Sequence, residues 1–379
     1  MSARSSNGPG IATRVFGSQW FVSVLAVLIA FVIGAILIAL SGASVVDAYY
    51  AMFRGSIVDP NAANAVRMIK PLTDSLFYSI PLIISGLGLA LGFRAGLFNI
   101  GGKGQIIVGA LAAVWVGFSL NLPPVLHTLV ALLVAIVAGG LYGGIAGVLK
   151  AKTGANEVIV TIMLNSIATL GLGYTLAQKA WQVPGTNQPV TPKVAESAAL
   201  ARLLPAPFKL HVGFLVALVA LVAFWWLIER STLGFQIRAV GANAAAARTA
   251  GISVERITAI TMVLSGAFLG LAGANEALGT IGYVSRDVAG SIGFDAITVA
   301  LLGRNKTWGT FGAGLLFGAF KAGGYTMQAK GVPIDMILIL QSVIVLLIAA
   351  PALVRWLFRL PDVRALAANT RKGNADEHK

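Results

Sequence analysis

The side chains that carry out bond chemistry in enzymes are few in this chain and widely separated. The 379 residues include three histidines, His127, His211 and His378, and no cysteine. Without cysteine there is no thiolate metal ligand, no catalytic thiol and no disulfide framework. No two histidines lie at the spacing of metal ligands, so the sequence does not support a metalloenzyme. We expect no metal and no resident cofactor.

A glycine-rich segment, Phe93–Gln105, contains Gly-Gly-Lys-Gly and therefore invites comparison with a nucleotide-binding loop. A P-loop requires a glycine five positions before its Gly-Lys pair and a serine or threonine after the lysine. Leu97 and Gly104 occupy those two positions. The sequence therefore predicts that the chain does not bind ATP by this route.

Long uncharged windows dominate the sequence and decide its class. Hydrophobic residues make up 57% of the chain and charged residues 11%, and the mean hydropathy is +0.84. A helix needs about 20 apolar residues to cross the hydrocarbon core of a bilayer. Windows of at least about that length are Trp20–Val46, Ser75–Phe93, Gly104–Leu149, Val158–Gln178, Leu210–Ile228, Ile257–Asn275 and Met336–Val354. We expect an all-α membrane protein.

About ten transmembrane helices follow from these windows. The longest splits at Asn121-Leu-Pro-Pro, because proline ends a helix, and a weaker pair at about 288–303 and 307–328 is interrupted by Asp295 and Lys321. The segment Ile84–Gly92 resembles Leu264–Gly273, and the two would cross the membrane in opposite directions. This favours two inverted five-helix halves, an arrangement common in transporters.

The net charge of +14 follows the predicted topology. With the N-terminus inside, most lysines and arginines fall in cytoplasmic turns and tails, as the positive-inside rule requires. We therefore interpret the charge as topology and expect no nucleic-acid partner. The predicted organisation is a disordered cytoplasmic tail at 1–17, a transmembrane domain at 18–360 that includes the cytoplasmic loop 230–256, and a cytoplasmic tail at 361–379.

Polar side chains at membrane depth are costly to bury and therefore mark a solute path. Asp295 can bind a solute, pair with Lys321 or Arg304, or cap a broken helix. Glu157 and Asn165 lie about two turns apart on one helix face, although Glu157 can also serve the start of its helix, where an anion is favoured. The candidate path residues are Asn99, Gln105, Glu157, Asn165, Asn275, Glu276 and Asp295.

Segment 230–252 has the signals of a structured element between two apolar windows. Asn243 can cap a helix over Ala244–Ala250, and Gly251 can supply the left-handed residue that ends it. A second short helix is predicted at Leu233–Val240. We predict a helix–turn–helix on the cytoplasmic face, with an alanine surface for a soluble partner.

Ala246-Ala247-x-x-x-Gly251 resembles the motif in the cytoplasmic loop of ABC importer permeases, a loop that docks in a groove of the ATPase subunit. Three blocks, Gly96–Gln105, 232–252 and Gly293–Gly303, make the chain similar to permeases of the branched-chain amino acid/ribose/nucleoside importer family. Gly154–Asn165 is particularly similar to one of the two permeases of bacterial nucleoside importers. Lys103 departs from the family pattern, and the leading glutamate of the motif is absent.

The resemblance implies a permease in the bacterial cytoplasmic membrane, with both termini cytoplasmic, that translocates a nucleoside or similar small solute. It implies as partners ABC ATPase subunits that bind the ATP, a second and different permease subunit, and an extracytoplasmic substrate-binding lipoprotein. The permease itself is then not an enzyme. The residues expected to couple it to the ATPase are Gly234, Arg238, Asn243, Ala246, Ala247, Arg248 and Gly251.

Alternative functions remain at this stage. An ABC permease for monosaccharides or branched-chain amino acids fits the same motifs. An ion-coupled carrier explains the spans and Asp295 but gives the loop 230–256 no purpose. A membrane-embedded enzyme would need paired acids, a His/Asp set or a metal site, and the sequence contains none that we identify.

Overall fold

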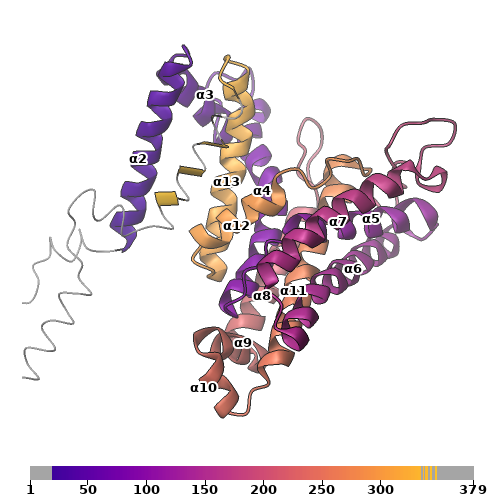
Figure 1. The fold of residues 1–379 in the computed structure, drawn as a ribbon. Helices are drawn as coiled ribbons and strands as arrows, with labels where there is room; N and C mark the ends of the chain where they lie inside the picture. The colour runs from indigo at the N-terminus through magenta and orange to yellow at the C-terminus, as the bar shows by residue number, and fades with distance from the viewer. Residues whose placement is uncertain (1–18, 334–335, 337, 340–341, 344–345, 348–379) are drawn as a thin grey trace, which may run out of the picture. The chain divides into compact units, whose positions relative to one another are not determined.

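The structure is a computed structural model that describes residues 19–333, 336, 338–339, 342–343 and 346–347 (Figure 1). Within these residues the regular elements are helical, and one isolated β-bridge pairs Arg202 with His211. The elements are α2 (Gln19–Leu40), α3 (Val45–Ser56), α4 (Ala65–Arg94), α5 (Gly102–Ser119), α6 (Pro124–Thr153), α7 (Glu157–Ala177), the 3₁₀ turn η1 (Lys179–Trp181), α8 (Gly213–Trp225), the π-helical η2 (Trp226–Arg230), α9 (Thr232–Ala242), α10 (Ala244–Thr249), α11 (Val254–Asn275), the π-helical η3 (Glu276–Ile281), α12 (Ile292–Leu302) and α13 (Thr307–Gln328).

The chain divides into two compact units, one formed by Met1–Tyr49 with Met327–Lys379 and the other by Tyr50–Thr326. In the first unit, the Tyr49 hydroxyl donates to the carbonyl of Phe31 in α2, and the two rings pack edge to face. The predicted tails at 1–17 and 361–379 lie outside the described residues. Most of the predicted span 336–354 also lies outside them.

Six helices in the described part are long and apolar enough to cross a membrane, namely α4, α5, α6, α7, α8 continued by η2, and α11 continued by η3. The predicted split is confirmed, because α5 ends at Ser119 and α6 begins at Pro124. The first predicted span is present as α2, which ends before the uncharged window does. Its helix ends at Leu40, after which Gly42 adopts φ 81° and the chain turns into α3.

The weaker pair of predicted spans is present as α12 and α13, with one difference. Helix α13 matches 307–328, but α12 has 11 residues and begins later than the predicted 288. The chain between η3 and α12 runs through turns that include Gly282 and Gly290, both with positive φ. Helix α12 is therefore too short to span a bilayer of about 30 Å at 1.5 Å per residue.

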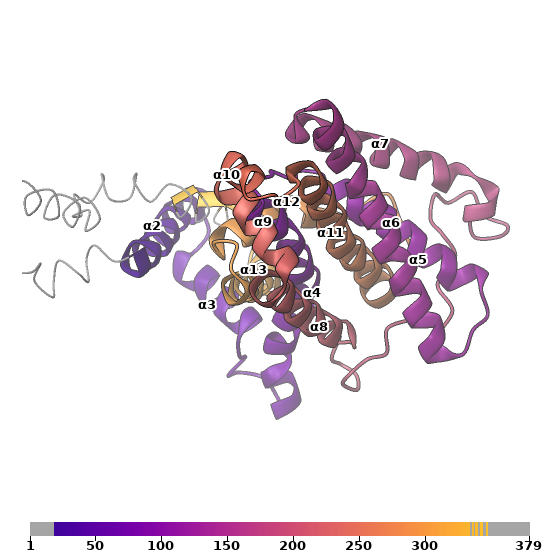
Figure 2. The same ribbon diagram turned by 90° about the horizontal axis from the view of Figure 1, so that it is seen from below.

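Helix α11 is the centre of the second unit and lies between α6 and α4 (Figure 2). Glycines allow its close approach to α6, as the small-xxx-small pattern predicts. A Cβ on Gly139 would come within 2.5 Å of the Gly266 carbonyl oxygen, and one on Gly143 within 2.6 Å of the Met262 carbonyl oxygen. In the sequence these glycines are four residues apart, a spacing that predicts close helix packing, and the structure confirms that prediction.

The two similar segments of the sequence meet in this core. A Cβ on Gly88 of α4 would lie 2.8 Å from Phe268 Cβ and 2.9 Å from the Ser265 carbonyl oxygen of α11. Helix α4 ends against α9, where Gly241 contacts the Arg94 carbonyl, and α11 begins shortly after α10. The two helices therefore run in opposite directions at the end of the unit that carries α9 and α10. We call this end the α9–α10 end.

The long loop 182–212 closes the opposite end, which we call the long-loop end. The loop contains no further helix and is held by backbone hydrogen bonds, from Ala195 N to Gly117 O at 2.8 Å, from Leu200 N to Leu278 O at 3.1 Å and from Thr191 N to Val284 O at 3.0 Å. His127, buried in α6, adds a bond from its ring to Ser197 Oγ at 2.8 Å. The loop is thus a cap over this end of the helices.

Candidate functional site

Loop 230–256 forms the predicted helix–turn–helix, and each predicted cap is in place. The Asn243 side chain accepts a hydrogen bond from Ala246 N at 3.0 Å, which satisfies a free donor at the start of α10. Gly251 has φ 81° after the end of α10, and Ile252 N donates to the Ala247 carbonyl at 3.0 Å, as in a Schellman motif. Helix α9 differs from the prediction by continuing to Ala242.

Helix α9 is anchored to the membrane-spanning helices by one face. Gly234, Ile237 and Val240, three residues apart, are buried, whereas Phe235 is 61% exposed. A Cβ on Gly234 would lie 2.7 Å from the carbonyl oxygen of Ile228, so only glycine fits at this corner. Gly241 is in equally close contact with the carbonyl of Arg94. Close packing thus joins α9 to η2, which continues α8, and to the end of α4.

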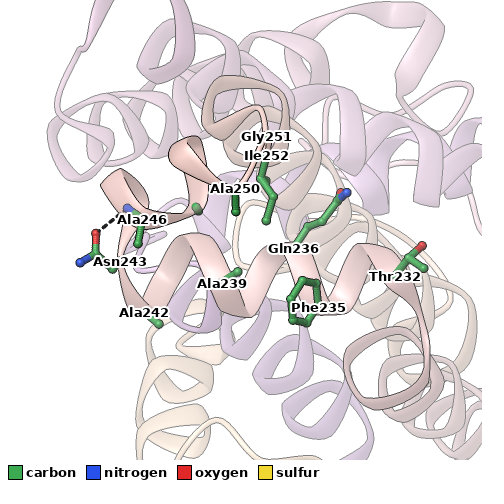
Figure 3. Close-up of a pocket in the computed structure, with 11 residues that line it drawn as sticks. Thr232, Phe235, Gln236, Ala239, Ala242, Asn243, Ala246, Ala250, Gly251 and Ile252 are labelled. Atoms are coloured by element: carbon green, nitrogen blue, oxygen red, sulfur yellow. Dashed lines mark hydrogen bonds between the residues drawn. The ribbon is translucent and has the colours of Figure 1, made fainter.

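A groove of about 620 Å³ lies between α9 and α10. Phe235, Gln236 and Ala239 line it from α9, and Ala246 and Ala250 from α10, with Ile252 at its end (Figure 3). Its lining is mainly small and apolar, so it can receive a protruding apolar side chain of another protein. Ala247 also lines the groove, although it is only 4% exposed and is packed between α10 and its neighbours.

The charges at the α9–α10 end are mainly basic. Arg238 is partly exposed on α9, and Arg248 on α10 pairs with exposed Glu255 at the start of α11. Of the two arginines predicted to meet a partner, Arg248 thus already has an acidic neighbour. The lysines and arginines that the structure places at this end are Arg94, Lys150, Lys152, Arg230, Arg238, Arg248, Arg256, Arg304 and Lys306.

Three of the predicted path residues meet in one buried network that supports the hairpin 95–101. Asn99 Nδ2 donates to Gln105 Oε1 at 3.1 Å and to Ser265 Oγ at 2.9 Å. Asn165 accepts from Gly104 N at 2.8 Å and donates to the Ile100 carbonyl at 2.8 Å. The hairpin thus has its backbone groups satisfied by side chains, as irregular backbone within a membrane protein must.

The remaining predicted path residues lie elsewhere. Glu157 pairs with Lys150 at 2.9 Å beside the N-terminus of α7, where Asn156 caps the helix. Asn275 is fully buried and donates to the Gly213 carbonyl at 3.3 Å. Asp295 lies in the first turn of α12 and accepts a hydrogen bond from Ser291 Oγ at 2.6 Å. Glu276 begins η3.

Sequence reasoning missed several residues that complete these arrangements. Thr161 and Ser265 belong to the hairpin network, with Ile100 N donating to Thr161 Oγ1 at 3.2 Å. The ring of His211 is buried against Phe77, at 5.5 Å between centroids, and its Nδ1 accepts from Gly213 N at 3.1 Å. Neither a hydroxyl in an apolar helix nor a lone histidine carries a sequence signal that would have identified these partners.

Comparison with known proteins identifies the family. Residues 72–349 match the family model described as branched-chain amino acid transport system / permease component. The chain is 39% identical to the guanosine ABC transporter permease protein NupP of Bacillus subtilis, over 89% of this chain and 95% of that protein. It is 35% identical to the glucose ABC transporter permease protein TsgB13 of Haloferax volcanii, over 85% of each chain.

A third relative is the nucleoside ABC transporter permease protein NupB of Lactococcus lactis, 30% identical over 92% of this chain and 95% of that protein. No solved structure matches the chain. ABC permeases are transport components that work with ATPase and binding-protein partners, which agrees with the apolar spans and the structured loop. The chain is therefore a multi-pass membrane protein that belongs to the permease-component family of the branched-chain amino acid transport system.

Proposed function

We propose that the chain is the membrane-spanning permease of an ATP-driven importer and that its solute is a nucleoside. The observation that carries the proposal is the likeness to the guanosine permease, which extends over nearly the whole of both chains. The α9–α10 helix pair supports the proposed coupling to an ATPase. A simple connector between two spans would need neither capped helices nor a groove, whereas a docking surface has both. The ATP is then bound and hydrolysed by separate subunits, and this chain holds no cofactor.

The proposed topology has ten spans in two inverted five-helix halves, with both termini and the α9–α10 end in the cytoplasm of a bacterial cell. The basic residues gathered at that end support this orientation under the positive-inside rule. Exposed or partly exposed acids at the opposite end, among them Asp59, Glu196 and Asp287, agree with it. The antiparallel contact of α4 with α11 supports the inverted halves.

The proposed assembly pairs this permease with a second, different permease, two ATPases and a substrate-binding lipoprotein outside the membrane. Closure of the ATPases on ATP would move α9 and α10. Because Gly234 and Gly241 pack directly against the ends of α8 and α4, that motion reaches the spanning helices without an intervening flexible segment. Of the seven coupling residues, Gly234 packs α9 against η2, whereas Asn243, Ala246, Ala247 and Gly251 line the groove.

A second candidate function is import of a monosaccharide, favoured by the likeness to the glucose permease. Uptake of labelled guanosine, glucose and leucine separates the candidates when measured in cells that lack only this gene and in the complemented cells. We expect deletion to abolish high-affinity guanosine uptake and leave the other two unchanged. Intact guanosine uptake after deletion would contradict the nucleoside proposal, and loss of glucose uptake alone would establish the alternative.

A further inference from the structure

Three charged side chains from three different elements gather on one side of the second unit. Glu276 begins η3, Asp295 lies in the first turn of α12, and Lys321 lies in α13. The ammonium of Lys321 is within electrostatic range of both carboxylates, and all three side chains are partly exposed. We call these three residues the charged face. It carries two acids and one base.

Two residues of the charged face, Asp295 and Lys321, lie at membrane depth. Asp295 precedes Gly303 by eight residues, about 12 Å of helix rise, and the turn after Gly303 is fixed at the α9–α10 end by a bond from Arg94 Nε to Asn305 O at 2.7 Å. Lys321 lies 14 residues beyond the start of α13, about 21 Å along that helix. Both distances fall within a hydrocarbon core of about 30 Å. Glu276 lies beyond them, toward the long-loop end.

Lipid is an unsuitable neighbour for these side chains. Charged residues within spans face a water-filled cavity or the protein interior because contact with hydrocarbon is costly. The three side chains are partly exposed, and the group that meets their open side must be polar, such as water, a solute or a polar surface of protein. Glu276 also begins a π-helical turn, a distortion found most often at functional sites.

Two aromatic rings border the charged face. Tyr78 of α4 and Tyr325 of α13 have ring centroids 5.4 Å apart, and Tyr325 is 44% exposed. Tyr78 is within electrostatic range of Glu276. An open aromatic ring offers a stacking surface to a flat heterocycle. A carboxylate beside it can accept hydrogen bonds from two neighbouring hydroxyl groups.

We propose that the charged face, with Tyr78 and Tyr325, is a solute-binding site of the permease that takes a ribonucleoside. The heterocycle stacks on Tyr325, and Glu276 accepts hydrogen bonds from the vicinal hydroxyls of the ribose. The ammonium of Lys321 neutralises the charge of one of the two carboxylates. Hydrogen bonds from the ribose hydroxyls stabilise the remaining negative charge. This inference rests on the proposed function, because the solute class comes from it.

The chain contains no cysteine, so a substituted cysteine is its only thiol and accessibility can be read at one position. Tyr325→Cys is produced in the assembled transporter and treated with a membrane-impermeant thiol reagent, and labelling of this chain is followed by its mass. The control is Leu170→Cys on α7, an apolar position that is 75% exposed. We expect at least tenfold faster labelling of Tyr325→Cys and protection of that position by guanosine.

Phe294→Cys, which alters a side chain 54% exposed beside Asp295, provides a second reporter should Tyr325→Cys fail to assemble. In either reporter, guanosine is expected to protect at a concentration at least tenfold lower than 2′,3′-dideoxyguanosine. Adding Glu276→Gln should bring the two concentrations within about twofold. Asp287→Asn, an exposed acid in the turn before α12, should leave the tenfold ratio unchanged.

Guanosine uptake by the unsubstituted transporter is measured in parallel. If uptake occurs but neither reporter is labelled faster than Leu170→Cys, or guanosine gives no protection, the site proposal is overturned and the proposed function stands. The same conclusion follows if Glu276→Gln leaves the tenfold preference intact. If the unsubstituted transporter imports no guanosine, the proposed function itself fails.

Discussion

The left-handed glycine after α10 offers a substitution whose cost comes from the backbone alone. Gly251 has φ 81°, and an added Cβ would meet no atom within 4 Å. An L-residue in this conformation costs about 1–2 kcal/mol, so Gly251→Ala should destabilise the end of α10 by that amount. Gly251→Val should cost more because its side chain is β-branched. Gly251→Asn should cost least, since asparagine tolerates this region.

Helix α10 is only marginally stable, so a loss of this size is large for it. It contains six residues, and helices of that length are marginal in water without tertiary support. A loss of 1–2 kcal/mol changes a conformational equilibrium about 5–30-fold. We therefore expect the affinity of the ATPase subunits for the permease to fall about 5–30-fold in Gly251→Ala. The loss should be larger for valine and smaller for asparagine.

Two measurements on the reconstituted transporter check this series: the affinity for added ATPase subunits and the guanosine imported per ATP hydrolysed. The matched control is Gly171→Ala in α7, where an added Cβ also meets no atom and the glycine does not have positive φ. That variant should behave like the unsubstituted protein. If Gly251→Val binds the ATPase and couples transport normally, the backbone argument is refuted.

Three further changes probe the same structure. Asn243→Ala removes the cap of α10, worth about 0.5–2 kcal/mol, and should reduce uptake at equal protein level; unchanged uptake would contradict the capping role. Gly139→Leu must force α6 away from the Gly266 carbonyl, so folded protein recovered in detergent should fall sharply, whereas Gly171→Leu should be recovered normally. Asn165→Leu leaves Gly104 N and Ile100 O without their side-chain partner, which should destabilise the folded protein by about 1–3 kcal/mol for each buried group and lower its melting temperature. An unchanged melting temperature would show that Asn165 does not support the hairpin.

Local signals are the ones that sequence reasoning interpreted correctly. The split at Asn121, the cap at Asn243 and the left-handed Gly251 each depend on a few consecutive residues whose conformational preferences are strong. The glycine spacing in α6 likewise predicted a close helix contact, although only the structure names α11 as the partner. These features require no knowledge of distant parts of the chain.

Long-range partners could not be predicted in the same way. Asn99, Gln105 and Asn165 were interpreted as path residues because polar groups in a membrane helix need a partner. The sequence does not say that the partner is the hairpin backbone, 61 positions from Asn165 in the case of Gly104. The contact of α12 with α5 is equally long-range, since a Cβ on Gly293 in the first turn of α12 would lie 2.5 Å from Lys103 N.

The most direct test of the central claim is guanosine uptake by the complete transporter in proteoliposomes, with ATP as the only energy source and no ion gradient. The account predicts that uptake requires both this chain and the ATPase subunits, and that it survives ionophores that collapse ion gradients. Uptake that proceeds without the ATPase subunits, or that stops when only an ion gradient is removed, would contradict it.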